Sequence, residues 1–228
     1  SDVLSLHQFA DKHDIQWWLQ SKGPETIRPL VPEHEGQLAY TLPEFGLRMP
    51  YRPTDFTQVN HYINRALISR ALKLLDAQPT DRVADMFCGL GNFSLPIATQ
   101  AREVVGVEGS KTLTERAYQA AKEAGLNNAT FDTLNLFEVD QTWLAGLGYF
   151  DKMLIDPPRE GAQALCESLS ELPVNLRPKR IVYVSCNPST LARDAAIMQA
   201  KGSYKLKSAG VINMFPHTGH VESIAVFE

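Results

Sequence analysis

Cysteine is scarce in this chain of 228 residues, which contains only Cys88, Cys166 and Cys186. Three dispersed cysteines cannot build a disulfide framework, so we expect a reducing environment. They form no CxxC pair and no cluster, which argues against a structural zinc or iron–sulfur site, or any other metal site, within the chain. The sequence also lacks an apolar run of the ~20 residues that a membrane-spanning helix needs, and its first residues do not resemble a secretory signal.

Basic residues are also fewer than acidic ones: the chain contains 22 lysines and arginines and 26 aspartates and glutamates, which gives a net charge of −4. Affinity for nucleic acids usually depends on basic side chains that neutralise phosphates, so this balance argues mildly against nucleic-acid binding. The length fits one ordinary domain with a small appendage, and it is long enough to bury a substantial core.

The chain divides near residue 52. Residues 1–52 contain a helical stretch around Leu6–His13, followed by short apolar segments separated by Gly, Pro and Glu. These segments predict short strands and turns at Ile15–Leu19, Leu38–Leu42 and Leu47–Tyr51. This part is too small to fold alone, and we expect it to belong to a larger neighbouring region.

From Gln58 onward, helical and strand patterns alternate, which predicts a parallel sheet covered by helices on both faces. The expected strands are Arg82–Phe87, Glu103–Val107, Ala129–Leu134, Lys152–Asp156, Arg180–Ser185, Leu206–Met214 and Val221–Phe227. The expected helices are Val59–Leu75, Asn92–Gln100, Lys111–Ala124, Gly161–Leu172 and Pro188–Ala200. No helix separates the last two strands, so we expect the final strand to be antiparallel.

A glycine loop follows the first strand of this pattern. The segment VADMFCGLGNFSLPIA places Asp85, Gly89 and Gly91 between that strand and the next helix. In a doubly wound sheet, ligands bind beyond the carboxyl ends of the strands, and glycines let them approach the backbone. Glu108, near the end of the next strand, is suited to accept hydrogen bonds from ribose hydroxyls. We interpret the loop as a site for S-adenosylmethionine. A dinucleotide site and a plain glycine turn remain alternatives, although the third glycine of the dinucleotide fingerprint is missing.

A second feature is the segment IVYVSCNPSTLARD, in which an apolar strand leads to Cys186. Asn187 is a good helix-capping residue and Pro188 a good first helical residue. Backbone N–H groups and the helix dipole at such a start favour a thiolate, which is the nucleophilic form of cysteine. Cys186 is therefore a candidate nucleophile. The alternative is a buried apolar cysteine, as we expect for Cys166 on a helix face and for Cys88 in the glycine loop.

Two further motifs lie at the same expected edge of the sheet. In MLIDPPREGA, Asp156 ends a strand and Arg159 follows two prolines, which indicates either a ligand or target contact or only a rigid corner. In MFPHTGHVESIAVFE, strand alternation places His220 and Glu222 on one face with apolar residues. Glu222 is a candidate general base, or else an ion-paired surface residue. A metal site of His217 and His220 with Cys186 is disfavoured, because packing and hydrogen bonding account for these histidines.

Five phrases, FTQVN, DMFCGLGNFSLPIA, DPPREGA, SCNPSTLARD and HTGHVES, occur in this order from Phe56 onward. Together they resemble the bacterial RNA (uracil-5-)-methyltransferases, and most of all the members that act on 23S ribosomal RNA. The resemblance implies an α/β fold, that of the class I S-adenosylmethionine-dependent methyltransferases. This fold is Rossmann-like, with a seven-stranded, mostly parallel sheet and an antiparallel last strand. It also implies methyl transfer from S-adenosylmethionine to carbon 5 of a specific uridine in 23S rRNA, through a cysteine adduct at carbon 6, leaving S-adenosylhomocysteine.

The resemblance also assigns roles to residues and domains. It implies that residues 53–228 form the catalytic domain and residues 1–52 a strand-rich remnant of a central domain. The implied catalytic residues are Cys186, Glu222 and Asp156. The implied cofactor-binding residues are Gln58, Asp85, Phe87, Gly89, Gly91, Asn92, Glu108, Asn135 and Asp156, and the implied substrate-binding residues are Phe56 and Arg159.

Members of this group carry an N-terminal RNA-binding OB-type (TRAM) domain and a cysteine cluster that holds a [4Fe–4S] centre, and neither is in this chain. We therefore expect a fragment of a cytoplasmic, monomeric protein with no membrane association and no evident protein partner, whose missing domain supplies basic RNA contacts. Two alternatives remain: an RNA cytosine-5 methyltransferase, and a truncated cofactor-binding domain without activity of its own. Exocyclic-amine methyltransferases are disfavoured, because Arg159 stands where an aromatic residue usually follows their two prolines.

Overall fold

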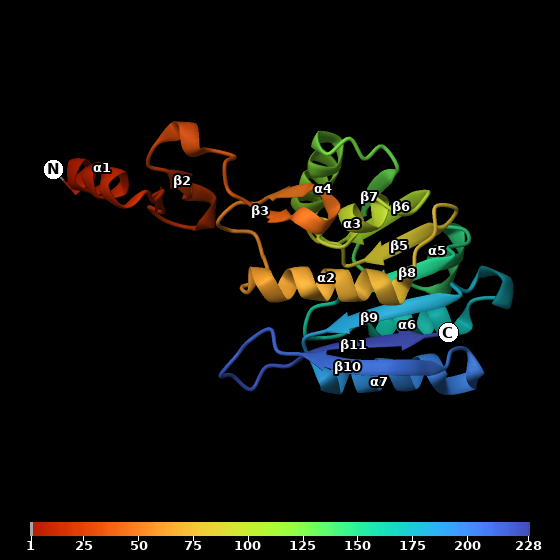
Figure 1. Cartoon of the computed structure of the whole chain (residues 1–228). Coiled ribbons are helices and arrows are strands. Elements are labelled where there is room, and N and C mark those ends of the chain that lie inside the picture. The colour runs from red at the N-terminus through yellow and green to blue at the C-terminus, as the bar shows by residue number, and fades with distance from the viewer. Residues whose placement is uncertain (1) are drawn as a thin grey trace. The chain divides into compact units, whose positions relative to one another are not determined.

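The structure is a computed structural model that describes residues 2–228, with no side-chain description at Lys201. It comprises two compact units, which are drawn in Figure 1. The first unit consists of the residues up to Thr41 together with Arg48–Thr57, and the second of Leu42–Leu47 and Gln58–Glu228. No helix among the described residues is long and apolar enough to cross a membrane.

The first unit is built from one helix and very short strands. Helix α1 (Asp2–His13) is longer than the sequence predicts. Strand β1 (Trp18–Leu19) lies within the predicted strand Ile15–Leu19, and it pairs antiparallel with β2 (Arg28–Pro29), a strand that was not predicted. Strands β3 (Ala39–Leu42) and β4 (Leu47–Pro50) form a second two-stranded sheet, close to the predicted positions. The indole N–H of Trp17 donates to the carbonyl of Leu6 at 3.1 Å, which holds α1 to the segment that follows it.

The second unit contains a seven-stranded sheet in the order β10-β11-β9-β8-β5-β6-β7. Its strands are β5 (Arg82–Met86), β6 (Glu103–Glu108), β7 (Ala129–Thr133), β8 (Lys152–Ile155), β9 (Arg180–Ser185), β10 (Leu206–Ile212) and β11 (Glu222–Phe227). Strands β5 to β9 are parallel, and β11 lies antiparallel between β9 and β10. The expected class I methyltransferase topology, with its antiparallel last strand, is therefore confirmed.

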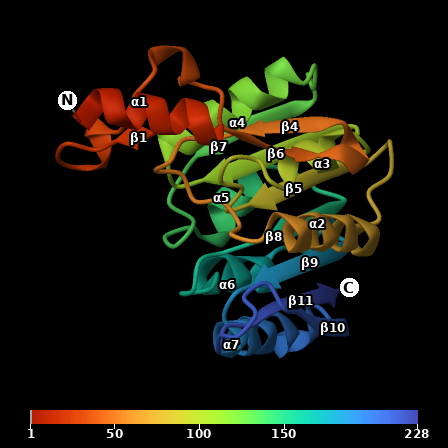
Figure 2. The same cartoon turned by 60° about the vertical axis from the view of Figure 1, so that its left-hand side comes forward.

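Helices cover both faces of this sheet (Figure 1, Figure 2). Helices α2, α3 and α4 form one layer, in which α2 contacts β8, β9 and β11, and helices α5, α6 and α7 pack together in the other. Their bounds are α2 (His61–Leu75), α3 (Ser94–Ala98), α4 (Lys111–Glu123), α5 (Gln141–Gly146), α6 (Gln163–Glu171) and α7 (Pro188–Gln199). Because both faces are covered, the central strands are mainly apolar after their charged first residues, and Val83, Ala84 and Met86 are fully buried.

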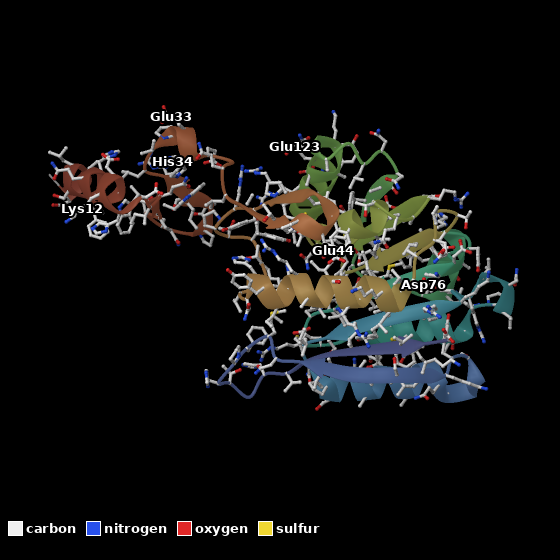
Figure 3. All side chains as sticks on the ribbon, in the orientation of Figure 1. Lys12, Glu33, His34, Glu44, Asp76 and Glu123 are labelled. Atoms are coloured by element: carbon white, nitrogen blue, oxygen red, sulfur yellow. The ribbon has the colours of Figure 1, made fainter. Side chains whose placement is uncertain are left out.

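Charged side chains join α2 to the starts of the central strands. Asp76, labelled in Figure 3, ends α2 in a left-handed conformation with φ of 53°. Its carboxylate lies 3.7 Å from Arg180 and 3.9 Å from Lys152, and Lys152 also pairs with the mostly buried Asp81 at 3.1 Å. Arg180 pairs with Glu228 as well. These pairs lie at the strand starts, so the opposite edge of the sheet, where the parallel strands end, remains available for a site.

Candidate active site

The candidate site lies along the edge at which the parallel strands end and β11 begins. Glu108 ends β6 and Asp85 lies one residue before the end of β5, while Asp156 and Cys186 directly follow β8 and β9. Glu222 is the first residue of β11. Since Ser223 pairs with Ser185, Glu222 and Cys186 are the next residues beyond that pair on adjacent strands. The sheet thus brings together five residues from distant parts of the sequence.

The glycine loop after β5 turns sharply. Phe87, Gly89 and Gly91 have φ values of 65°, 54° and 84°, a left-handed conformation that is uncommon for a residue such as phenylalanine. The carbonyl of Val107 holds the turn by accepting N–H bonds from Phe87 at 2.9 Å and from Cys88 at 3.1 Å. A Cβ at position 91 would lie 2.4 Å from a methyl carbon of Leu95, so glycine is required there on steric grounds too.

Two carboxylates flank this loop. Glu108 accepts hydrogen bonds from the backbone N–H groups of Gly89 at 3.2 Å and Ser110 at 3.0 Å, so it is fixed against the loop. Asp85 is fully buried and accepts a hydrogen bond from the hydroxyl of Ser94. Burial raises the pKa of Asp85 from 3.8 to about 7. Its second oxygen, Oδ1, has no hydrogen-bond partner within residues 2–228.

Sequence reasoning missed Asn64, which holds one of the predicted cofactor residues. Asn64, on α2, exchanges two side-chain amide hydrogen bonds with Asn92, at 3.0 and 3.1 Å. Only 2% of Asn64 is exposed, and it lies in the apolar stripe that continues through Ile68, Ala71 and Leu75. A polar residue within that stripe was the available signal, since a buried amide needs a partner.

Two further predicted cofactor residues are Gln58 and Asn135. Gln58 is half-buried, and its Oε1 has no partner within the described part of the chain. Asn135 is exposed and accepts a hydrogen bond from the N–H of Phe137 at 3.2 Å. The ring of Phe137 lies 5.5 Å from that of Phe87. The unpartnered oxygen of Asp85, near the end of the strand that leads into the left-handed glycine loop, fits a ligand that carries amino or hydroxyl donors, as S-adenosylmethionine does.

Cys186 is half-buried in a pocket of about 250 Å³. The pocket is lined by Arg159, Cys186, Asn187, Pro188, Gly219, His220 and Val221. As predicted, Asn187 caps the next helix by accepting from the N–H of Ser189 at 3.1 Å, and Pro188 is the first helical residue. The two other cysteines are buried, as expected, Cys88 in the glycine loop and Cys166 on α6.

The predicted ease of forming a thiolate at Cys186 is wrong for this structure. Burial raises the pKa of the Cys186 thiol, the charges of Glu222 and Asp156 raise it further, and only the charge of Arg159 and a backbone hydrogen bond oppose them. The helix start is present, but a dipole of partial charges is weaker than desolvation combined with two full negative charges.

Glu222 is buried, with 2% of its surface exposed. Desolvation raises its pKa from 4.5 to about 7. The pKa of Asp156 is also raised well above its usual value, first by burial and then by the charges of Glu222 and Asp85. A carboxyl group that titrates near neutrality, beside a cysteine, is suited to exchange a proton in the pocket.

Arg159 and His220 both line the pocket. A terminal nitrogen of Arg159 is 3.1 Å from Nδ1 of His220, whose ring contacts Phe215 with centroids 5.8 Å apart. The prediction that His220 shares a strand face with Glu222 is wrong, because β11 begins only at Glu222 and His220 is exposed in the preceding turn. His217 is exposed as well, and no group of three or more His, Cys, Asp or Glu residues in the described chain is placed to hold a metal ion.

Phe56 belongs to the first unit and is 77% exposed. Its predicted contact with a target base therefore stays a prediction.

Comparison with known proteins places these features in a family. The family model described as tRNA (Uracil-5-)-methyltransferase matches residues 35–228. The chain is 74% identical to the 23S rRNA (uracil(1939)-C(5))-methyltransferase RlmD of Bordetella bronchiseptica, over all of this chain and 49% of that protein. It is 61% identical to the RlmD of Cupriavidus metallidurans, over all of this chain and 50% of the relative. The chain therefore spans about half the length of the curated relatives it matches.

Among solved structures, the tRNA (uracil-54, C5)-methyltransferase of Pyrococcus abyssi, in complex with S-adenosyl-L-homocysteine, is similar. It superposes with a TM-score of 0.69 at 28% identity, over 84% of this chain and 44% of that one. The family model covers most of the chain, including the glycine loop, Cys186 and Glu222, so the chain belongs to the tRNA (uracil-5-)-methyltransferase family.

Proposed function

We propose that this chain is the catalytic part of an enzyme that transfers a methyl group from S-adenosylmethionine to carbon 5 of a specific uridine in 23S ribosomal RNA. The observation that carries the proposal is that Cys186 and Glu222 are the next residues beyond the Ser185–Ser223 pair of two adjacent strands. Cys186 lines a pocket on the same sheet edge as the glycine loop. The names of the RlmD relatives support the choice of 23S rRNA as substrate.

The proposed reaction uses Cys186 as a covalent catalyst, because carbon 5 of uracil is a poor nucleophile by itself. Addition of the Cys186 thiolate to carbon 6 makes carbon 5 an enolate-like centre. S-adenosylmethionine, when bound, supplies the methyl group that this centre attacks. Glu222 then removes the proton from carbon 5, the bond between carbon 6 and the sulfur breaks, and 5-methyluridine is released with the cysteine restored.

The charges around Cys186 affect the pH at which its thiol ionises. Arg159 favours the thiolate, whereas the negative charges of Glu222 and Asp156 disfavour it. The raised pKa of Glu222, about 7, leaves about half of its carboxyl groups protonated at neutral pH. In the protonated form Glu222 adds no negative charge while the sulfur adds to the base. Ionisation of Glu222 afterwards equips it to accept the carbon-5 proton.

The methyl donor is proposed to lie against the glycine loop. Glu108 would accept hydrogen bonds from the ribose, and the free oxygens of Gln58 and Asp85 would accept from donor groups of the cofactor. The other proposed contacts of the donor are Phe87, Gly89, Gly91, Asn92, Asn135 and Asp156. Asp156, positioned between the glycine loop and Cys186 in the order of strands, would hold donor and target in register.

The target uridine must leave its stack to enter the pocket, because its reacting edge is inaccessible in a stacked strand. We propose that Phe56 stacks on the flipped base and that Arg159 contacts it. Both assignments rest on the resemblance of FTQVN and DPPREGA to the family's phrases, together with the place of Arg159 in the pocket lining.

The longer protein is proposed to supply what this chain lacks. Residues 1–52 would be part of a central domain, and an OB-type domain and a [4Fe–4S] cluster would lie in the half that the chain does not span. That half would also provide basic contacts to RNA, offsetting the net charge of −4. We further propose that the protein is monomeric and acts in the cytoplasm, where ribosomal RNA is its partner.

The decisive experiment uses RNA that carries 5-fluorouridine, whose carbon-5 fluorine cannot be removed as a proton. The chain should form a stable covalent complex in the presence of S-adenosylmethionine, visible as a shifted band on a denaturing gel. Cys186→Ala should abolish it, whereas Cys166→Ala should not. An adduct that persists in the Cys186→Ala variant would exclude this cysteine as the nucleophile.

Two assays separate the remaining alternatives. Nucleoside analysis of RNA methylated by the chain distinguishes 5-methyluridine from 5-methylcytidine. Calorimetry with S-adenosylmethionine, followed by a tritium-transfer assay on ribosomal RNA, distinguishes an enzyme from a domain that only binds the cofactor. Binding without transfer would mean that activity needs the other half of the protein.

A further inference from the structure

The loop that carries Arg159 is fastened by side chains of a single helix, α7. The carbonyl of Arg159 accepts a hydrogen bond from the amide of Asn187 at 3.0 Å. It also lies 3.2 Å from the hydroxyl of Thr190, which shares its single proton between this carbonyl and that of Asn187 at 3.0 Å. Three residues further along the loop, the backbone N–H of Ala162 donates to Asp194 at 2.7 Å. Arg193 donates to the carbonyl of Glu160 at 2.8 Å. Every one of these contacts comes from the first two turns of α7 or its cap.

These contacts form a stripe on the helix. Asn187, Thr190 and Asp194 are separated by three and four residues, the spacing that places side chains on one face of an α-helix. The cap of the same helix directly follows Cys186. One rigid element therefore begins at the candidate nucleophile and holds the neighbouring loop, so any movement of α7 shifts both together.

The far end of the stripe is buried and resists rearrangement. Asp194 is fully buried, and it also accepts hydrogen bonds from the hydroxyl of Tyr183 at 2.6 Å and from Arg193 at 2.8 Å. Gly161 has φ of 78°, and a Cβ there would lie 2.6 Å from Asp194. Moving the loop away from α7 would leave a buried carboxylate short of donors, which is costly. The loop is thus held at two points, near Arg159 and at Ala162.

The side chain of Arg159 points from this fastened backbone into the lining of the pocket that contains Cys186. There its positive charge opposes the effect of Glu222 and Asp156 on the thiol. A guanidinium can do this only while it stays close, because charge interactions weaken with distance and with exposure to solvent. A terminal nitrogen of Arg159 lies 3.1 Å from Nδ1 and 3.4 Å from Nε2 of the exposed His220. The fixed backbone carbonyl sets the point from which the Arg159 side chain extends into the pocket.

We propose that Thr190 and Asn187 are positioning residues, which hold the main-chain carbonyl of Arg159 so that its guanidinium remains beside the sulfur of Cys186. The proposal rests on the proposed function in one respect, namely that Cys186 is the nucleophile. It adds that the start of helix α7 influences the reactivity of this cysteine through the backbone of the Arg159 loop.

The test measures the reactivity of Cys186 without RNA or cofactor. The 228-residue chain is treated with iodoacetamide over a range of pH, and alkylation of the Cys186 peptide is followed by mass spectrometry. Cys88 and Cys166 are buried and serve as internal references. Arg159→Gln should shift the alkylation profile to higher pH, because it removes the charge that favours the thiolate. Thr190→Val, which removes the hydroxyl and keeps a similar shape, should shift the profile in the same direction.

Three variants make the result specific. Thr99→Val is the matched control, since Thr99 also donates to a carbonyl, that of Pro96 at 2.7 Å, at the end of α3, and its profile should equal that of the wild type. Asn187→Ser keeps a helix-capping oxygen, removes the amide donor and should behave like Thr190→Val. In the double variant Arg159→Gln, Thr190→Val, the profile should match Arg159→Gln alone, because Thr190 acts only through Arg159.

Either of two outcomes overturns the proposal: a wild-type profile for Thr190→Val, or a further shift in the double variant. In adduct formation with 5-fluorouridine RNA, Thr190→Val should be slower by on the order of tenfold to a hundredfold, with unchanged affinity for S-adenosylmethionine. The alkylation test stands by itself. If no RNA adduct forms in the wild type while the alkylation shifts hold, the proposed function fails and the positioning role survives.

Discussion

Glu222 links the proposed chemistry to pH at the scale of a single residue. Its pKa is raised from 4.5 to about 7. A general base must be ionised before it accepts a proton, so removal of the carbon-5 proton should quicken as the pH rises through about 7. Adducts with ordinary uridine RNA, followed on denaturing gels, should therefore break down more slowly at about pH 6 than at about pH 8. Glu222→Gln should retain the adduct at both, and normal release in that variant would remove Glu222 from the mechanism.

The same carboxyl makes stability depend on pH. Because the folded-state pKa is the higher one, the folded protein binds the proton more tightly than the unfolded chain. The stabilising contribution is complete below about 4.5 and is lost as the pH rises through about 7. The difference corresponds to roughly 3 kcal/mol at most. In urea unfolding, Glu222→Gln should gain stability relative to the wild type between about pH 4.5 and about pH 8. A difference that stays constant over this range would contradict the raised pKa.

Individual residues show which features of the site could be predicted from the sequence and which could not. The local signals at Cys186 and Asn187 predicted the cap and the helix start, because capping depends on neighbours in the chain. They gave the wrong direction for the pKa of Cys186, since desolvation and the charges of Glu222 and Asp156 come from other strands. The partnership of Asn64 with Asn92 was missed for the same reason: 28 residues separate the two amides in sequence.

At the scale of elements, the amide pair joins helix α2 to the glycine loop. Asn64→Leu would leave the buried side of Asn92 without this partner, which typically costs about 1–3 kcal/mol. We expect a lower urea midpoint and weaker binding of S-adenosylmethionine by calorimetry. Asn175→Leu, on an exposed turn, is the control and should change stability by less than about 0.5 kcal/mol. Equal midpoints for the two variants would show that the pair is dispensable.

The strands and helices of the second unit were largely predictable from the sequence. Strand β9 matches its predicted bounds, and most other strands differ by one or two residues, because buried parallel strands are continuous apolar runs. Helix α5 was missed, since six residues ending in glycine, QTWLAG, are too short to show helical periodicity. The start of β11 was placed one residue early, at Val221, and extending the strand alternation back to His220 assigned that residue to a strand face that it does not share.

At the scale of the whole molecule, binding of the methyl donor should stabilise the second unit. A ligand that binds only the folded state adds about 2.7 kcal/mol at a concentration one hundred times its dissociation constant. S-adenosylmethionine should therefore raise the unfolding temperature in calorimetry. Gly91→Val, which places a side chain into Leu95 at a left-handed position, should reduce this gain relative to its own ligand-free form. An undiminished gain would place the donor elsewhere than at the glycine loop.

The insertion of β11 between β9 and β10 has a consequence for the order in which the protein matures during translation. Strand β10 hydrogen-bonds only to β11 within the sheet, and β11 emerges from the ribosome after every other strand of that sheet. A nascent chain therefore contains Cys186 well before Glu222 has been synthesised. Under the proposed chemistry, a polypeptide interrupted after β10 would contain Cys186, which forms the covalent bond to RNA, but not Glu222, which is needed to break it. Synthesis of the last strand would therefore prevent an incomplete protein from remaining covalently bound to ribosomal RNA.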